Sequence, residues 1–317
     1  MRILKFGGKS LETKEKTQKI CEYIKKIYKK DKEIILIVSA MGNKTNELAS
    51  KASTFSSGII NKRELDSLLS IGETESSTLI AIMLNSLGVP AKSFQATQLN
   101  IRTFGDYQNS KIYYINKTIL YDCLKSNTVA VVAGFQGVNQ NNEITTLGRG
   151  GSDTTATAIG AIFNTPVEIY SDFNGVYSGD PRALPFKKLK HVSFKTMQEL
   201  SESGAKVLDS RAIKLARQYN IKLISKSSTQ PELKGTEINS IESNIVSITS
   251  INNLCSISII FDDACKLNFI IKSVIFVNKT FKIYNLHMKD GKINLIVNQA
   301  DSEKIISILS KKLKLIK

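Results

Sequence analysis

Two runs of uninterrupted apolar residues constrain the fold of this chain most strongly. They are Ile34–Val38, with the sequence IILIV, and Val129–Ala133, with the sequence VAVVA. Short runs without polar residues are typical of strands that are covered on both faces, as in a parallel sheet. Further short strands are predicted at residues 3–6, 167–170 and 221–224.

Helical patterns lie between these strands. Residues 11–30 have isoleucines at helical spacing, and a helix at residues 73–87 is expected to end at Gly88. A glycine-rich turn at residues 148–151 precedes a helix of small residues at 153–162. The alternation of strands and helices predicts an α/β fold, a three-layer sandwich with a mostly parallel sheet between helices.

A polar, turn-rich segment at residues 227–236 is a candidate linker. It divides the chain into a larger domain at residues 1–235 and a smaller one at residues 236–317. The smaller domain is expected to be α+β, in the order strand, helix, strand, strand, helix, although its second element is ambiguous by pattern alone. The expected elements are residues 254–261, 267–277, 281–287, 293–297 and 301–312, with a turn at Asp290-Gly291.

The net charge of the chain is strongly positive, because 44 Lys and Arg against 28 Asp and Glu give +16. The lysines are spread along the sequence rather than clustered with aromatic residues, so neither nucleic acid binding nor membrane binding is predicted. The four Cys form no CxxC pair and the two His are isolated, so no zinc site is predicted. Without a secretory signal or a long apolar run, a reduced, cytoplasmic location is expected.

Three common catalytic patterns are incomplete in this sequence. The segment Gly8-Lys9-Ser10 resembles the end of a Walker loop, but Ile3 stands where that loop has its first glycine. The turn at residues 148–153 begins like a dinucleotide-binding fingerprint and lacks its last glycine. Ser152 is not in a nucleophile elbow, because Thr154 replaces the glycine that such an elbow requires.

Two glycine-rich turns remain as candidate anion-binding sites. The segment Lys5-Phe6-Gly7-Gly8 ends the first strand, and Arg149-Gly150-Gly151-Ser152 precedes a helix. Glycines let backbone N–H groups approach an anion, and the start of a helix adds partial positive charge. Since Lys5 and Arg149 add cationic side chains, the two turns together suit an enzyme that holds two anionic reactants.

A series of short motifs follows in order along the first 235 residues. They are KFGG at 5–8, VSAMG at 38–42 with Thr45, GE at 72–73, GFQG at 134–137, TLGRGGSD at 146–153, SD at 171–172 with GVY at 175–177 and DPR at 180–182, and GAKVL at 204–208 with RA at 211–212. This series resembles that of the aspartokinases, in the amino-acid kinase superfamily. The resemblance implies the amino-acid kinase fold and phosphoryl transfer from MgATP to the β-carboxylate of L-aspartate, with ATP and Mg²⁺ as cofactors. Because that carboxylate is already ionised at neutral pH, no general base is expected.

The resemblance also implies a role for each matching residue. Lys5 is expected to neutralise the transferring phosphoryl group, Lys206 to bind the nucleotide phosphates, and Asp153 to orient both lysines, unless Asp153 only caps its helix. The expected substrate contacts are Ser39, Thr45, Ser152, Glu73 on the ammonium group and Arg149 on the α-carboxylate. The expected nucleotide contacts are Lys5, Gly7, Gly8, Ser10, Ser171, Asp172, Tyr177, Arg182 and Lys206. Magnesium is expected to rest on phosphate oxygens and water, so no protein ligand of the metal is predicted.

Two positions depart from the usual pattern of the family. Lys9 stands where a small hydroxyl residue is usual, and Asp209-Ser210 stands in place of His-Pro. Neither change removes an expected catalytic residue, so kinetic constants are expected to differ more than the activity itself.

The C-terminal domain departs further. Aspartokinases typically have two ACT modules there, whereas residues 245–317 leave room for one degenerate ACT-like module. The usual glycine-rich effector loop is absent, and Phe261-Asp262-Asp263-Ala264-Cys265 takes its place. Feedback by lysine or threonine is therefore expected to be weak or absent. The module is expected to serve dimerisation or folding, in a homodimer or a higher homo-oligomer.

Two other functions stay open at this point. A kinase of the same fold could act on another amino acid, although an N-acetylated substrate would have no ammonium group for Glu73. A non-catalytic nucleotide-binding regulator could use the same scaffold. Such a regulator would be expected to lose one of Lys5, Arg149, Asp153 and Lys206, and all four are present.

Overall fold

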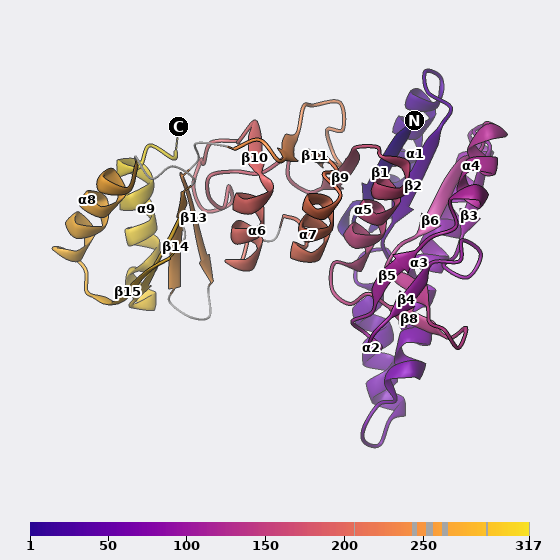
Figure 1. The fold of residues 1–317 in the computed structure, drawn as a ribbon, viewed down its shortest axis with the longest axis horizontal. Helices are drawn as coiled ribbons and strands as arrows, with labels where there is room; N and C mark the ends of the chain where they lie inside the picture. Colours follow the sequence, from indigo (N-terminus) through magenta and orange to yellow (C-terminus); the bar gives the residue numbers. More distant parts are fainter. Residues whose placement is uncertain (206, 243–245, 252–255, 262–265, 290, 317) are drawn as a thin grey trace. The chain divides into compact units, whose positions relative to one another are not determined.

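The computed structural model describes residues 1–317 except 206, 243–245, 252–255, 262–265, 290 and 317. The chain divides into two compact units (Figure 1). The first comprises Met1–Asn174 and Leu215–Lys234, and the second comprises Gly175–Lys214 and Gly235–Lys317. The domain boundary that the sequence suggests after residue 235 stays a prediction.

A parallel sheet forms the centre of the first unit, with the strand order β11-β9-β1-β2-β6-β3. Its strands are β1 (Arg2–Phe6), β2 (Ile34–Val38), β3 (Ala91–Phe94), β6 (Val129–Ala133), β9 (Val167–Ser171) and β11 (Leu223–Ser227). Both apolar runs are strands whose residues are all buried, which confirms the prediction made from them. The edge strand β3 was not predicted, because its sequence AKSF has no such pattern.

Helices cover both faces of this sheet. Leu4 and Phe6 of β1 share a buried cluster with side chains of α1 (Lys14–Tyr28) and α3 (Lys62–Ser86). Successive side chains of a strand point to opposite faces, so Lys5 points to the other face. There it meets α5 (Gly151–Phe163), which packs on β1, β2 and β9, while α4 (Lys117–Lys125) packs on β6. The predicted three-layer sandwich is confirmed.

The helix predicted to begin at Glu73 begins eleven residues earlier in the chain, at Lys62, so that prediction was wrong. Asn61 caps α3 by accepting hydrogen bonds from the N–H groups of Arg63 and Glu64. Gly72 lies inside the helix rather than before it. A Cβ atom at Gly72 would lie 2.8 Å from the Cβ of Ala40, so glycine is required there for close packing and not as a helix boundary.

The rest of the first unit completes the sandwich. The helix α2 (Lys44–Phe55) packs against α3, and a small mixed sheet has the order β5-β4-β7-β8. Its strands are β4 (Arg102–Phe104), β5 (Lys111–Tyr114), β7 (Gln136–Val138) and β8 (Ile144–Thr146). The boundary between the two units falls within α7 (Ser210–Gln218).

An antiparallel sheet of order β13-β14-β16-β15 dominates the second unit. Its elements are β13 (Val246–Ile251), β14 (Ser256–Phe261), α8 (Leu267–Asn278), β15 (Ile283–Lys289), β16 (Lys292–Val297) and α9 (Ser302–Lys312). The predicted order from strand to final helix is confirmed, and the ambiguous second element is a helix. The strand β13 was not predicted, and Asp290 of the expected turn lies outside the described residues, as do Asp262–Cys265 of the expected effector-loop position.

We call the apolar interior of this part the C-terminal core. It is formed by buried side chains of β13, β14, α8, β16 and α9, among them Ile248, Ile259, Ile270, Leu295 and Leu309. The second unit also contains α6 (Phe194–Glu202) and the parallel pair β10 (His191–Ser193) and β12 (Thr236–Asn239). In the described part of the chain, no helix is long and apolar enough to cross a membrane.

Candidate active site

Several of the predicted site residues of the first unit lie where parallel strands end. The register places Phe6 of β1 beside Val38 of β2 and Tyr170 of β9, and Val38 beside Ala133 of β6. The carboxyl ends of these strands therefore lie along one edge of the sheet. Ser171 ends β9 at this edge, and the loops that leave the edge contain Gly7, Gly8, Ser39 and Asp172. In open parallel sheets, this edge is where ligands bind.

Lys5 and Asp153 form a buried ion pair across the sheet-helix interface. The Nζ atom of Lys5 lies 2.6 Å from Oδ1 of Asp153, and each side chain is 11% exposed. A Cβ atom at Gly7 would lie 3.5 Å from the same Nζ, so the ammonium group sits beside the glycine turn. The pair thus holds a positive charge next to backbone that an anion can approach.

Asp153 does not cap its helix. The helix α5 begins at Gly151, and Gly150, the residue before it, has the left-handed φ of 73° and offers no side-chain cap. Asp153 lies inside the first turn, where its carboxylate faces Lys5. The position of Asp153 therefore does not fit the alternative in which it only caps its helix.

At two glycines, segments of the chain pack closely against each other at the edge of the sheet. A Cβ atom at Gly8 would lie 2.4 Å from the carbonyl oxygen of Ala40, and Gly8 accepts a hydrogen bond from the N–H of Gly42 at 2.9 Å. A Cβ atom at Gly134 would lie 2.8 Å from the Cβ of Ser152. The loops after β1 and β2 thus lie against each other, and the first turn of α5 lies against the end of β6.

Glu73 is the most perturbed acid at this edge. Its side chain is 4% exposed, and Oε1 accepts a hydrogen bond from the N–H of Ala40 at 3.0 Å. Burial raises the pKa of Glu73 to about 7, although the Ala40 N–H group and the charge of Lys5 oppose the shift. The second oxygen, Oε2, is buried and accepts no hydrogen bond from any described residue. A buried carboxylate oxygen without a partner suits a cationic ligand.

Asp66 was not predicted as a site residue, although it holds part of the site in place. It is fully buried in α3, and its carboxylate accepts hydrogen bonds from the N–H of Gln108 and from both the N–H and the hydroxyl of Thr146. Thr146 lies just before the turn of Arg149, so Asp66 ties this turn to α3. In the sequence Asp66 looks like any charged residue of a helix, and no local signal marks it as buried.

The remaining predicted residues of the first unit vary in exposure. Ser10 and Ser152 are buried, Ser39, Thr45 and Ser171 are half-buried, and Arg149 and Asp172 are exposed. The hydroxyl oxygen of Ser10 has no hydrogen-bond partner among the described residues. The same is true of Thr154 Oγ1 and Asn174 Oδ1, which the sequence did not single out and which are additional candidates for ligand contacts.

Lys9, the departure from the family pattern, is exposed and pairs with Asp172. Its Nζ lies 3.8 Å from Oδ2 of Asp172, and the two side chains are 78% and 47% exposed. The long side chain therefore does not crowd the glycine turn. In the other departure, Asp209 immediately precedes α7 and Ser210 begins it, and Oδ1 of Asp209 lies 3.1 Å from Nε of Arg211.

Two predicted nucleotide contacts, Tyr177 and Arg182, belong to the second unit. Tyr177 is half-buried and packs against the C-terminal core, and Arg182 is exposed and pairs with Asp180 at 2.6 Å. Lys206 lies outside the described residues.

The described ranges contain no group of three or more His, Cys, Asp or Glu suited to a metal ion. That magnesium rests on phosphate oxygens and water stays a prediction.

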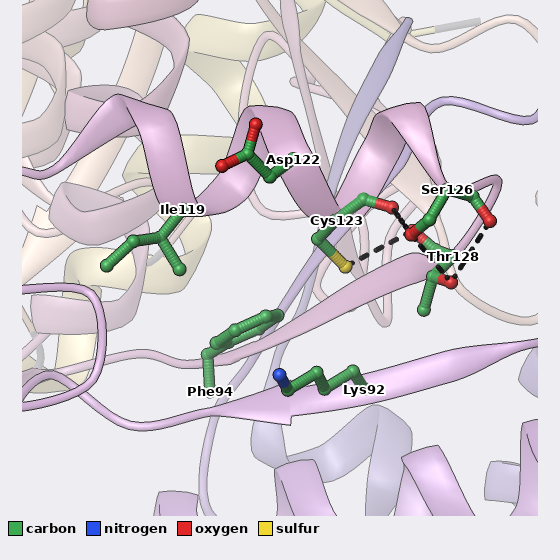
Figure 2. Close-up of a pocket in the computed structure, with 7 residues that line it drawn as sticks. All are labelled: Lys92, Phe94, Ile119, Asp122, Cys123, Ser126 and Thr128. Carbon is green, nitrogen blue, oxygen red and sulfur yellow. Dashed lines mark hydrogen bonds between the residues drawn. The ribbon is translucent and has the colours of Figure 1, made fainter.

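A pocket of about 350 Å³ lies elsewhere in the first unit, between β3 and α4 (Figure 2). It is lined by Lys92, Phe94, Ile119, Asp122, Cys123, Ser126 and Thr128. None of these is a predicted site residue. The hydroxyl of Ser126 and the thiol of Cys123 are already hydrogen-bonded within the loop that joins α4 to β6.

This chain is similar in sequence to several known proteins. The model of the amino acid kinase family matches residues 1–225. The aspartokinase of Rickettsia felis is 41% identical over 266 residues, which cover 81% of this chain and 66% of the relative. The aspartokinase of Rickettsia bellii is 40% identical over 84% of this chain and 68% of the relative. The aspartokinase of Corynebacterium glutamicum is 40% identical over 71% of this chain and 54% of the relative. The chain thus spans about two thirds of the length of the rickettsial relatives and about half of the corynebacterial one.

Solved structures show the same fold. Escherichia coli aspartokinase III, crystallised with aspartate and ADP, superposes with a TM-score of 0.85 at 17% identity, covering 99% of this chain and 100% of that one. Aspartate kinase from Synechocystis superposes with a TM-score of 0.68 at 24% identity, covering 99% and 69%. The family match over residues 1–225, together with the Rickettsia bellii relative at 40% identity, of which this chain covers 68%, shows that this chain belongs to the aspartokinases of the amino acid kinase family.

Proposed function

We propose that this chain transfers the γ-phosphoryl group of MgATP to the β-carboxylate of L-aspartate. The product, 4-phospho-L-aspartate, is the first intermediate toward lysine, threonine and methionine. Its membership of the aspartokinases supports this reaction, as do relatives of that name at about 40% identity. The E. coli relative was crystallised with aspartate and ADP, which supports the same pair of ligands here.

The reaction needs positioning and charge stabilisation rather than proton transfer. An oxygen of the β-carboxylate attacks the γ-phosphorus, and the bond from that phosphorus to the bridging oxygen breaks, so that ADP leaves with the electron pair. The carboxylate is ionised at neutral pH, and no proton moves. Magnesium arrives with ATP and shields the phosphate oxygens.

Lys5 is proposed to stabilise the charge on the transferring phosphoryl group. Its ammonium group lies beside Gly7, and Gly7 and Gly8 are proposed to contact phosphate oxygens. The ion pair with Asp153 fixes the ammonium group before substrate binds, so little reorganisation is needed during the reaction. Lys206 is proposed to bind the nucleotide phosphates.

The choice of substrate depends on the surroundings of the Glu73 carboxylate. Its buried Oε2 accepts no hydrogen bond from a described residue, and a free α-ammonium group would supply both the missing hydrogen bond and the compensating charge. An N-acetylated amino acid or carbamate would leave this carboxylate unpaired. Glu73 therefore favours a free amino acid, with its α-carboxylate on the exposed guanidinium of Arg149.

The other site residues keep their proposed roles. Ser39, Thr45 and Ser152 are proposed to contact aspartate. Ser10, Ser171, Asp172, Tyr177 and Arg182 are proposed to contact ATP. We further propose a cytoplasmic protein with a catalytic domain at residues 1–235, an ACT-like domain at residues 236–317, and a homodimeric or larger assembly that binds neither nucleic acid nor membranes.

A hydroxylamine trap tests the reaction directly. The full chain is incubated with MgATP and hydroxylamine, with L-aspartate, L-glutamate or N-acetylglutamate as separate substrates. Hydroxamate from L-aspartate alone is expected. Hydroxamate from another substrate would assign a different amino-acid kinase.

The variant Asp153→Ala separates an enzyme from a nucleotide-binding regulator in the same assay. An enzyme loses turnover on this change, because Lys5 loses its partner. If the unmodified protein binds ATP and forms no hydroxamate with any of the three substrates, aspartate kinase activity is refuted.

A further inference from the structure

A loop of the second unit contains two of the proposed ATP contacts and is built into the C-terminal core. We call residues 177–188 the nucleotide loop. Its ends pair through an isolated bridge between Tyr177 and Lys188, and the N–H of Ser178 donates to the carbonyl of Lys187 at 3.0 Å. Arg182 lies between these ends. The sequence places the loop in the catalytic domain, whereas the structure groups it with residues 235–317 in one compact unit.

Phe186 joins the nucleotide loop to the C-terminal core. Its side chain is 3% exposed and belongs to the same buried cluster as Ile248, Ile270 and Leu315. Tyr177 packs against this cluster as well. A loop residue that is buried to this degree is fixed by the packing of the surrounding core.

Hydrogen bonds fasten the two ends of the loop to the same part of the protein. The hydroxyl of Ser178 is buried and donates to the carbonyl of Leu315 at 2.7 Å. The N–H of Lys187 donates to the same carbonyl at 2.9 Å. From β13, the N–H of Ile248 donates to the carbonyl of Ser178 at 2.9 Å. Ser178 and Lys187, near the two ends of the loop, are therefore both hydrogen-bonded to backbone groups of the C-terminal part.

The ring of Phe186 also supports the turn that precedes Arg182. A Cβ atom at Gly179 would lie 2.3 Å from the Cζ of Phe186, so the backbone of Gly179 lies directly on the ring. The next residue, Asp180, holds the guanidinium of Arg182 through Nη2 and Oδ2 at 2.6 Å. The chain of contacts thus runs from the C-terminal core through Phe186 to Arg182.

We propose that Phe186 and Ser178 are positioning residues for nucleotide binding, and that the C-terminal core sets the affinity for MgATP through them. This inference rests on the proposed function, because it takes Tyr177 and Arg182 as ATP contacts. A loop that is ordered before the ligand arrives loses less conformational entropy on binding. Loosening the Phe186 anchor therefore weakens nucleotide binding and leaves the aspartate site unchanged.

The test compares changes at the anchor with a change in the same core away from the loop. Phe186→Ala removes the anchor, Phe186→Leu keeps an apolar side chain there, and Ser178→Ala removes one buried hydrogen bond. Ile270→Ala is the matched control, since Ile270 is fully buried in α8 and shares the core but not the loop. For each full-length variant, calorimetry gives the Kd for ADP and the melting temperature, and the hydroxamate assay gives KM for MgATP and for L-aspartate.

The expected result is specific to the nucleotide. Phe186→Ala raises the Kd for ADP and KM for MgATP by at least about fivefold, Ser178→Ala by about twofold to threefold, and KM for L-aspartate changes less than twofold. Phe186→Leu restores most of the affinity. Ile270→Ala lowers the melting temperature and leaves the Kd for ADP within about twofold of the unmodified protein.

Three outcomes overturn the inference. In the first, Phe186→Ala and Ile270→Ala weaken ADP binding equally, which shows a loss of stability and no positioning. In the second, Phe186→Ala does not fold, whereas Ser178→Ala and Phe186→Leu do. Both of these folded variants then bind ADP with the Kd of the unmodified protein. In the third, Phe186→Ala binds ADP as the unmodified protein does. An unmodified protein that binds ADP and forms no aspartyl hydroxamate refutes the proposed reaction, and the ADP titrations still decide the role of Phe186.

Discussion

Replacing Glu73 by Gln is expected to stabilise the protein without ligands while weakening aspartate binding. At this position an ionised carboxylate is buried with one oxygen unpaired, which lowers the free energy of unfolding. Gln has nearly the same shape and no charge, and its amide oxygen can still accept from the N–H of Ala40. Glu73→Gln therefore isolates the effect of the charge.

The magnitude follows from the pKa. The pKa of Glu73 rises from 4.5 to about 7 on folding, because burial penalises the ionised form. The folded protein thus binds the proton more tightly than the unfolded chain does. The resulting penalty is absent well below pH 4.5, grows as pH rises, and is complete above about pH 7. It amounts to about 1 kcal/mol at about pH 5 and about 3 kcal/mol at about pH 8.

Urea unfolding of both proteins, followed by far-ultraviolet circular dichroism, measures this difference. The stability of Glu73→Gln relative to the unmodified protein is expected to increase by about 2 kcal/mol between about pH 5 and about pH 8. Any cost of an unpaired Gln amide is the same at both values and cancels in this comparison. Glu75→Gln is the control, because Glu75 lies on the same helix, is 44% exposed and pairs with Lys44. Its effect is expected to stay within about 1 kcal/mol.

Substrate binding provides the second half of this prediction. Only the ionised form of Glu73 can pair with an ammonium group, so KM for L-aspartate is expected to rise by about tenfold between about pH 8 and about pH 6. Glu73→Gln is expected to raise KM by at least about tenfold and to remove this dependence. A stability difference that does not grow with pH, or an unchanged KM in the variant, would refute the reasoning.

Three further predictions concern the edge of the sheet. Lys5→Met and Asp153→Asn are each expected to lower kcat by at least about 100-fold in the hydroxamate assay, with KM for L-aspartate changed less, since both act on charge in the transition state. Lys9→Thr is expected to change KM for MgATP by less than about fivefold, because an exposed ion pair contributes less than about 1 kcal/mol; a larger change would assign Lys9 a phosphate contact. Gly8→Ala is expected to lower the free energy of unfolding by about 1–3 kcal/mol in urea, because its Cβ would lie 2.4 Å from the carbonyl of Ala40, and an unchanged midpoint would contradict that geometry.

Local patterns in the sequence determined the central sheet and the family. An apolar run such as Ile34–Val38 has no other stable place than a strand covered on both faces, and the structure confirms it. The glycine turns at residues 5–8 and 148–151 were recognisable as short local motifs, and Gly150 has the positive φ of 73° that favours glycine. These features depend on neighbours in the chain, so the chain alone reveals them.

Other features of the fold and the site depend on tertiary packing and could not be predicted from the sequence. Gly72 was taken for a helix boundary, because the sequence does not contain the Ala40 side chain that lies against it in space. The same packing decides the charge state of Glu73, since desolvation depends on every segment around a carboxylate. No local pattern in the sequence marks Phe186 as buried, and only the folded chain shows it inside the C-terminal core. Burial is a property of the assembled structure, and it is burial that distinguishes these residues from others of their type.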